Sequence, residues 1–316
     1  MTPPRLSILI PTWNGEEDLK RLLPALAEQE VEGGWELLAI DSSSTDRTLE
    51  LLKAAGARVE VIPQAEFGHG PTRNRLAEMA LGEVFVFLSQ DVVPASKDFL
   101  QELVRPLAEE HVAGSYARIL PHATDDALTA RTVLQAPEAA ERAPDLPDLS
   151  ADEVWNLSGA ERLNYLRFNN VASAVRAEVF REINFPPVPF GEDFAWAARV
   201  TKAGWRVRFA PGSVAYHAHR YSPSQAFERY RLDAAFHREI HGYCLRPSLL
   251  STLRGILFEI REDLRFVSAT KGAKWGDLLR SPALRGAQVL GQFWGSRGWG
   301  ADFWPEGDGS PTRSPR

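Results

Sequence analysis

The chain has 316 residues, of which 44% are hydrophobic, so we expect a globular protein with a sizeable core and exclude global disorder. Its formal net charge of −6 argues against a general nucleic-acid binder, because such proteins need a basic surface. Cys244 is the single cysteine, which excludes an intrachain disulfide, and no apolar run approaches the roughly 20 residues of a membrane span. We therefore expect a cytoplasmic protein, with peripheral attachment to the inner face of the membrane left open.

Residues 6–107 alternate short apolar runs with amphipathic segments, a pattern typical of strands and helices that follow each other. Strands are predicted at Leu6–Ile10, Glu36–Ile40, Arg58–Ile62 and Val84–Leu88. Pro11 is expected to end the first strand, and Asn14 and Glu17 have the spacing of a capping box for the first helix. The βαβαβαβ order predicts an α/β fold, with a mostly parallel, Rossmann-like sheet flanked by helices.

The remainder of the chain changes character twice. Residues 121–163 are rich in Ala, Asp, Glu and Pro, and we expect an irregular insertion with short helices. Two further strands are predicted at Trp205–Phe209 and Val214–Tyr216, after which the pattern is mainly helical. We therefore divide the chain into an α/β domain at 1–221, a C-terminal helical region at 222–304 and a disordered tail at 305–316.

Polar side chains follow the predicted strands at their carboxyl ends. The turn after the first strand lacks the Gly-x-Gly-x-x-Gly pattern, which argues against an ordinary dinucleotide-binding turn. The polar residues at the ends of the four strands are Thr12, Asn14, Asp41, Gln90 and Asp91, together with the loop His69–Asn74. Because the carboxyl ends of parallel strands meet at one edge of a sheet, these residues should converge on one ligand cleft.

Two acids at this edge each have two interpretations. Asp41 precedes a cluster of Ser and Thr residues and could cap the loop and the next helix; alternatively, its carboxylate could accept the imide N–H of a uracil or thymine ring. Asp91 follows the apolar strand Val84–Leu88 and could cap the next turn, or it could bind a metal or a sugar nucleotide. The residues alone leave both pairs of alternatives open.

Two later motifs add further ionisable groups. Glu192 and Asp193 begin a predicted helix, where acids favour the positive end of the helix dipole; the functional alternative is a general base for an acceptor hydroxyl. His217 and His219 follow a predicted strand, and alternation places both imidazoles on the same side of an extended chain. They are either structural residues or, with Asp91, ligands of a metal ion.

Taken together, these motifs resemble the family-2 glycosyltransferases, which have the GT-A fold. The resemblance rests on six segments in order: Leu6–Asn14, Ile40–Asp46, Thr72–Asn74, Phe87–Asp91, Gly191–Asp193 and Ala215–His219. Within that family, Phe67–Asn74, the Gln90-Asp91 pair and Phe185-Pro186 ahead of Gly191 look most similar to bacterial rhamnosyltransferases. The resemblance covers the α/β domain and leaves the C-terminal helical region without a counterpart.

The resemblance implies an inverting transferase that moves a sugar, with dTDP-rhamnose the expected donor, to a hydroxyl of a glycan or lipid-linked glycan in cell-surface glycan synthesis. The residues implied to bind the nucleotide sugar are Pro11, Thr12, Asn14, Asp41, Arg73, Gln90 and Asp91. Asp193 is implied as the general base, with Glu192 beside it contacting acceptor or donor. Asp91 is implied to bind Mg²⁺ or Mn²⁺, with His217 or His219 as a second ligand.

One position departs from the family pattern, because Ser89 stands where a second acid of the metal motif is common. A site with one carboxylate should bind a cation weakly before the donor supplies phosphate oxygens, which fits Mg²⁺. A reaction without metal also stays open. Alternative functions are a transferase that uses a UDP- or GDP-sugar, a nucleotidyltransferase, and a non-catalytic sugar-nucleotide-binding or scaffolding protein on the same fold.

The C-terminal helical region is rich in Trp and Phe, and three roles are open for these aromatic residues: core, a contact between copies of the chain, or an anchor on a membrane surface. The helical segments lack a clear basic face in the sequence, so we rank core or a contact in a homo-oligomer ahead of the membrane surface.

Overall fold

The computed structural model describes residues 5–298, which form two compact units. The first unit comprises residues 5–119, 140–155 and 166–217, and the second comprises residues 120–139, 156–165 and 218–298. The tail predicted at 305–316 lies outside the described residues, as do the last aromatic residues of the C-terminal region. Among the described residues, no helix combines the length and the apolar character needed to cross a bilayer.

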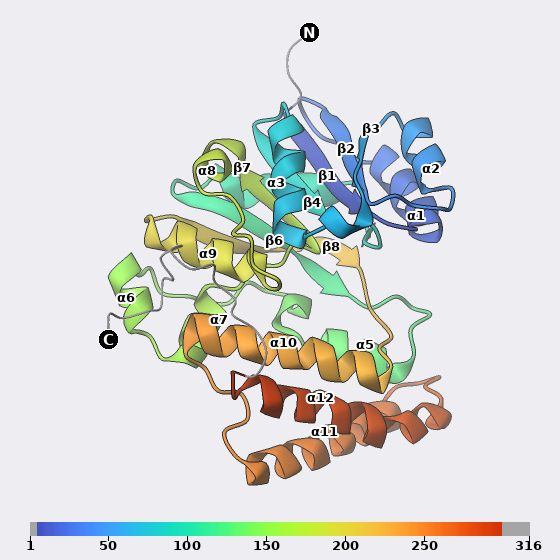
Figure 1. Cartoon of the computed structure of the whole chain (residues 1–316), viewed down its shortest axis with the longest axis vertical. Helices are drawn as coiled ribbons and strands as arrows, with labels where there is room; N and C mark the ends of the chain where they lie inside the picture. The colour runs from blue at the N-terminus through green and yellow to red at the C-terminus, as the bar shows by residue number, and fades with distance from the viewer. Residues whose placement is uncertain (1–4, 299–316) are drawn as a thin grey trace. The chain divides into compact units, whose positions relative to one another are not determined.

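A mixed eight-stranded sheet forms the centre of the first unit, in the order β3-β2-β1-β4-β7-β6-β8-β5 (Figure 1). The strands are β1 (Leu6–Thr12), β2 (Trp35–Asp41), β3 (Arg58–Val61), β4 (Val84–Leu88), β5 (Val93–Pro94), β6 (Val112–Leu120), β7 (Ala172–Arg176) and β8 (Arg206–Tyr216). β1 to β4 pair in parallel, whereas β7 runs antiparallel to β4 and β6, and β5 runs antiparallel to β8. The predicted α/β sheet, mostly parallel in its first half, is confirmed.

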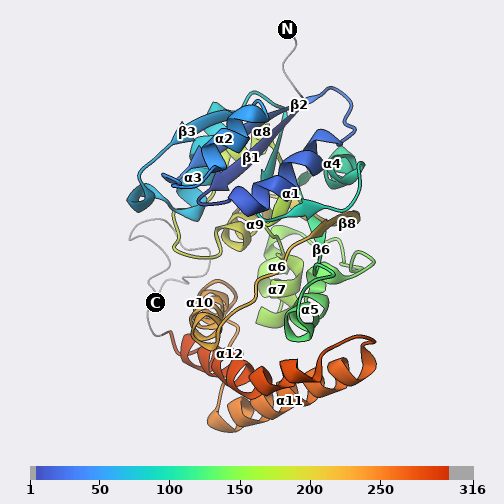
Figure 2. The same cartoon turned by 90° about the vertical axis from the view of Figure 1, so that its right-hand side faces the viewer.

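Helices cover both faces of this sheet (Figure 2). They are α1 (Glu16–Ala27), α2 (Thr48–Ala54), α3 (His69–Met79), α4 (Phe99–Val104), α8 (Ala177–Glu182) and α9 (Glu192–Lys202). One face carries an aromatic core in which Phe180 packs edge-on against Phe185, and Phe185 against Trp196. The indole Nε1 of Trp196 donates a hydrogen bond to the carbonyl of Ile183 at 2.7 Å, so its one polar atom is satisfied inside the core.

Three local predictions were wrong. β1 runs through Pro11 to Thr12. Its ladder with β4 ends at Leu9, so no carbonyl of β4 needs the backbone N–H that Pro11 lacks. The two strands predicted after residue 204 are one, β8, which continues through Pro211-Gly212. Asn14 forms no capping box: α1 begins after Gly15, whose N–H donates to the Thr48 hydroxyl at the start of α2, and the N–H of Glu16 donates to Asp46.

The second unit is helical, as predicted for the C-terminal region, and part of the insertion packs with it. Its helices are α5 (Ala127–Leu134), α7 (Gly159–Tyr165), α10 (Pro223–His241), α11 (Leu249–Ala269) and α12 (Ser281–Gly295), while α6 (Ala151–Asn156) ends at the border between the units. α12 lies between α10 and α11 (Figure 1). Gly291 and Gly295 allow this close approach, since a Cβ at either position would collide with the backbone of α10.

Buried charges join α5, α11 and α12 within the second unit. Asp263 is fully buried and accepts hydrogen bonds from Arg285 at 2.8 and 2.9 Å, and also from Arg131 and Ser281. Burial by itself would raise the pKa of Asp263, but the hydrogen bonds from Arg285, Ser281 and Arg131 bring it below its ordinary value. Asp263 is thus held as a carboxylate between two buried guanidinium groups.

We expect Asp263→Asn to destabilise the protein by about 3–5 kcal/mol, because it leaves the two arginines without their shared counter-charge. Urea unfolding followed by circular dichroism measures this free energy. Glu262→Gln is the matched control on the same helix: Glu262 pairs with the exposed Arg265, so its loss should cost less than about 1 kcal/mol. Equal effects of the two substitutions would show that the buried cluster does not hold the helices together.

Candidate functional site

The predicted convergence of polar loops follows directly from the strand pairings. β1, β2 and β4 are parallel, so Thr12 and Asp41, which end β1 and β2, lie at the same edge of the sheet as Asp91 in the turn after β4. β7 is antiparallel to β4 and therefore starts where β4 ends, with Ala172 opposite Leu88. The segment before β7 consequently joins the same edge.

The turn after β1 is held against the loop after β2. Asn14 has a positive φ of 44°, and its side-chain Oδ1 accepts a hydrogen bond from the N–H of Thr45 at 2.9 Å. Asp41 is fully buried and accepts hydrogen bonds from the Thr12 hydroxyl at 3.0 Å and from the N–H and hydroxyl of Ser44 at 2.8 and 2.6 Å. These are the contacts of the capping alternative for Asp41, and its recognition of a base stays a prediction.

Gln90 ties the turn after β4 to the turn after β1. Its Oε1 accepts a hydrogen bond from the N–H of Trp13 at 2.8 Å, and its Nε2 donates to the Trp13 carbonyl at 3.2 Å. Gly15 makes room for this contact, because a Cβ there would come within 2.7 Å of the Gln90 Oε1. The amide thereby fixes the backbone of Trp13, a residue that is 49% exposed.

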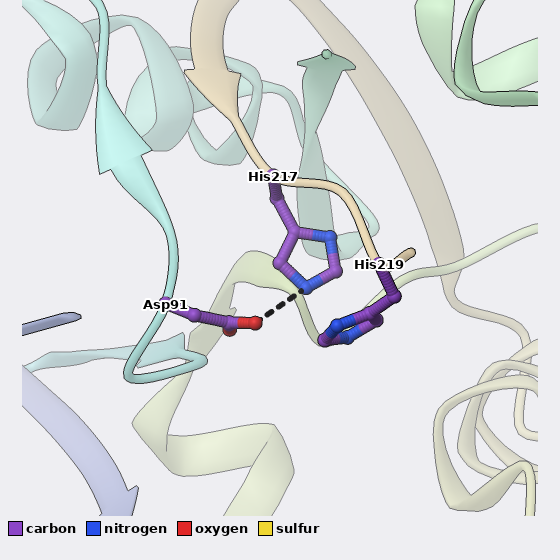
Figure 3. Close-up of side chains that lie close together, drawn as sticks. All are labelled: Asp91, His217 and His219. Atoms are coloured by element: carbon purple, nitrogen blue, oxygen red, sulfur yellow. Dashed lines mark ion pairs between the residues drawn. The ribbon is translucent and has the colours of Figure 1, made fainter. Parts of the chain in front are cut away.

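Asp91, His217 and His219 come together although more than a hundred residues separate them. The cause is the short ladder of β5 with β8, in which Val93 lies opposite Tyr216. Nε2 of His217 lies 3.3 Å from Oδ2 of Asp91, and one ligand atom from each of the three residues lies within 4.8 Å of the others (Figure 3).

These three side chains fit a divalent cation. Figure 3 shows both imidazoles on the side of the chain that faces Asp91, as the alternation of residues predicts. His217 and Asp91 are mostly buried, with 12% and 23% of their side chains exposed, whereas His219 is exposed. One carboxylate and two imidazoles form a mixed oxygen and nitrogen donor set, which suits Mn²⁺ better than Mg²⁺, an ion that prefers oxygen ligands alone.

Glu192 and Arg73 form a buried ion pair at the start of α9. Arg73 Nη1 lies 2.8 Å from Glu192 Oε1, and the two side chains are 5% and 8% exposed. Gly70 lets α3 come close to this segment, since a Cβ there would come within 2.7 Å of the Pro186 carbonyl. Asn74 adds a paired contact, because its amide donates to the carbonyl of Phe185 and accepts from its N–H.

Asp193 follows directly and is held by backbone donors. Its Oδ1 accepts from the N–H of Phe194 at 2.8 Å, and its Oδ2 accepts from the N–H of Asn170 at 3.2 Å. Removal from water and the neighbouring Glu192 carboxylate together raise the pKa of Asp193 to about 7, against the opposing effects of the two backbone N–H groups and Arg73. A carboxyl group with this pKa exchanges a proton near neutral pH, as a general base must.

Comparison with known proteins identifies the family. The model for glycosyl transferase family 2 matches residues 7–162. The O-antigen chain rhamnosyltransferase WbaN of Salmonella anatum is 30% identical over 240 residues, which cover 74% of this chain and 72% of that protein. RfbN of Salmonella typhimurium, also an O-antigen chain rhamnosyltransferase, is 29% identical over 239 residues, with the same coverage. The chain belongs to glycosyltransferase family 2.

The protein is therefore a glycosyltransferase, and its fold agrees with solved relatives. A mannosyltransferase from Pyrobaculum calidifontis, in complex with GDP-Man and Mn²⁺, matches with a TM-score of 0.54 at 18% identity and covers 94% of this chain and 73% of that one. TarS of Staphylococcus aureus, in complex with UDP-GlcNAc, matches with a TM-score of 0.51 at 17% identity and 90% coverage of both chains. These likenesses confirm the predicted GT-A fold.

Sequence reasoning missed one residue of the candidate site, Asn170. Its N–H binds Asp193, its side-chain amide donates to Glu192 at 3.3 Å, and its Oδ1 accepts from the Ser173 hydroxyl at 2.9 Å. The only signal in the sequence is the pair Asn169-Asn170 ahead of an apolar strand, which is typical of any turn. Its role depends on β7 starting at the edge where β4 ends.

The stability of the glycosyltransferase should depend on pH through Asp193. An aspartate in the unfolded chain ionises near pH 4, whereas the folded pKa is about 7, so the folded state binds more protons between these values. The stabilisation from this protonation is complete below pH 4 and is lost as the pH rises through about 7. We expect Asp193→Asn, which stays neutral, to raise Tm relative to the wild type more at pH 8 than at pH 5, as measured by calorimetry.

Asp145→Asn provides the control for this measurement, because Asp145 is exposed in the same unit. Its Tm difference from the wild type should be the same at both pH values. A pH-independent difference for Asp193→Asn would contradict the raised pKa.

Proposed function

We propose that this glycosyltransferase moves rhamnose from dTDP-rhamnose to a hydroxyl group of a cell-surface glycan, either free or lipid-linked, with inversion at the anomeric carbon. The observation that carries the donor assignment is the similarity to the two Salmonella O-antigen rhamnosyltransferases over 74% of the chain. The site supports the reaction class, because an acid with a pKa of about 7 shares one sheet edge with an Asp and His cluster.

The donor is proposed to lie along the edge formed by the turns after β1, β2 and β4. The Pro11–Asn14 turn and Asp41 would receive the base, while Gln90 keeps the turn in place through both of its hydrogen bonds to Trp13. Arg73 is proposed to contact the donor phosphates. Its buried ion pair with Glu192 supports a second role, in which its positive charge partly offsets the negative charge at the start of α9.

Asp193 is the proposed general base. The acceptor hydroxyl gives its proton to the Asp193 carboxylate as its oxygen attacks the anomeric carbon, and the nucleoside diphosphate leaves from the opposite face. Backbone N–H groups of Asn170 and Phe194 hold both carboxylate oxygens, which orients the base before the acceptor arrives. Glu192 is proposed to contact acceptor or donor, and its negative charge keeps the pKa of Asp193 high.

Asp91, His217 and His219 are the proposed ligands of Mn²⁺ or Mg²⁺. A divalent cation bound there supplies positive charge that neutralises the leaving diphosphate. Mn²⁺ is present in the solved complex of the Pyrobaculum mannosyltransferase, which supports the same type of cation here. Ser89 leaves the site with one carboxylate, so we propose that affinity for the cation rises when the donor binds.

Removal of either mostly buried ligand should weaken the cation site. We expect Asp91→Asn and His217→Gln each to lower Mn²⁺ affinity by about tenfold or more, measured by isothermal titration calorimetry with and without dTDP. Mn²⁺ should bind more tightly than Mg²⁺ because of the imidazole nitrogens. His111→Gln, at an exposed histidine, is the control. Unchanged Mn²⁺ affinity in both ligand variants would reject this site.

A thermal-shift screen tests the donor. With Mn²⁺ present, dTDP and dTDP-rhamnose should raise Tm more than UDP, UDP-GlcNAc, GDP or GDP-mannose at equal concentration. At one concentration, the ligand with the lower Kd stabilises the folded state more. Preference for UDP or GDP would overturn the dTDP assignment in favour of the donors bound by TarS or by the mannosyltransferase. Slow hydrolysis of the preferred donor separates an enzyme from a non-catalytic binding protein.

The pH dependence of turnover tests the base. We expect kcat/KM to rise with pH through about 7 as Asp193 loses its proton, and Asp193→Asn to lower kcat by at least about a hundredfold with little change in donor affinity. In Glu192→Gln the rising limb should move to lower pH, because a negative neighbour is removed while Arg73 remains. An unmoved limb in Glu192→Gln would argue against Asp193 as the titrating base.

A further inference from the structure

Helix α11 carries an apolar face that no described residue covers. Leu249, Leu253 and Leu257 are 68%, 61% and 69% exposed and recur every fourth residue. Leu250 and Leu264 are also exposed, and at 3.6 residues per turn the five leucines span an arc of about 100°. The opposite side of the helix, with Gly255 and Asp263, is buried in the second unit, so the leucine face is not part of the core.

A row of arginines borders the leucines on the same helix. Arg254, Arg261 and Arg265 are exposed and fall within an arc of about 40° next to the leucine arc. The other exposed positions of α11 are Phe258, Ser268 and Ala269, so this side holds no acid. We call these exposed leucines and arginines together the α11 face. Its charge is positive although the whole chain carries −6.

The α11 face is positive because the fold directs the acids of α11 away from its exposed side. Asp263 is buried between two arginines, Glu259 pairs with the buried Arg131, and Glu262 lies partly buried against Arg265. The sequence-based expectation that these helices lack a basic face was wrong for this reason: acids and arginines are mixed along the sequence and separate only around the packed helix.

The segment after α11 extends the same chemistry. Lys271 and Lys274 are exposed, and the turn of helix at Trp275–Arg280 carries Trp275 at 62% exposure and Leu279 at 87%. Tryptophan beside lysine or arginine is typical of segments that lie at the boundary between lipid and water.

We propose that the α11 face binds the surface of an anionic phospholipid bilayer, with the leucines entering the boundary of the acyl chains and the arginines on the phosphates. Arginine suits this place, because its stem packs on apolar surface while its guanidinium group binds phosphate oxygens. A second copy of the chain would cover the leucines but would bring two rows of arginines together, in which, among the described residues, only Arg265 has an acid, Glu262, beside it. The proposal does not depend on the donor or on catalysis.

Vesicle flotation with the full chain tests this proposal. The wild type should float with vesicles that contain phosphatidylglycerol, bind much less to pure phosphatidylcholine, and dissociate as salt is raised. Leu253→Ser with Leu257→Ser should lower binding to anionic vesicles by about tenfold or more, and Arg254→Gln with Arg261→Gln should remove the preference for the anionic lipid. All four side chains are exposed, so circular dichroism and Tm should stay as in the wild type.

Leu81→Ser and Arg105→Gln are matched controls, because these residues are similarly exposed on the first unit, and both should bind as the wild type. The proposal is overturned if the wild type stays unbound on phosphatidylglycerol vesicles, or if the paired leucine variant binds them normally. It is also overturned if light scattering shows a dimer that the leucine variant dissociates while vesicle binding is absent, since a second copy would then be the occupant.

Discussion

The parallel pairing of β1 with β2 and β4 is the constraint on which the candidate site depends. It places the carboxyl ends of three strands at one edge, so Thr12, Asp41 and the turn with Asp91 are neighbours by topology. The antiparallel strands then add residues from far along the chain to this edge: β7 brings Asn170, and the two-residue ladder of β5 with β8 brings His217. These two antiparallel pairings therefore add residues from the second half of the chain to the candidate site that the first half begins.

Burial gives these residues their chemistry. Asp193 would be an ordinary, fully ionised acid in water, but the interior and the adjacent Glu192 carboxylate move its pKa to about 7. Arg73 limits this shift and lets Glu192 be buried, since an unpaired carboxylate there would destabilise the folded state. The same principle holds in the second unit, where Asp263 stays charged only because two arginines surround it. In both places the fold fixes a charge state through the neighbours of an acid.

The buried pairing of the acids of α11 also determines the charge of the protein surface. Those that pair with buried arginines stabilise the packing of α5, α11 and α12, and by turning inward they leave the outer side of α11 to leucines and arginines. A single amphipathic helix thus serves the core with one side and presents the α11 face with the other. α12 packs closely on α10 at Gly291 and Gly295, and α11 packs on the other side of α12.

The sequence alone determined the α/β order, the strand ends that carry Asp41 and Asp91, and the acidic start of α9, because periodicity and strand ends are local properties. The family followed from motifs that stand in order along the chain. Only the tertiary structure decided that Asn14 binds Thr45 and caps no helix, and that Asn170 supports Asp193. It also placed Asp91 beside His217, raised the pKa of Asp193 and separated the arginines of α11 from its acids. These properties depend on which distant segments meet and on what water they exclude, and local sequence patterns hold no information about either.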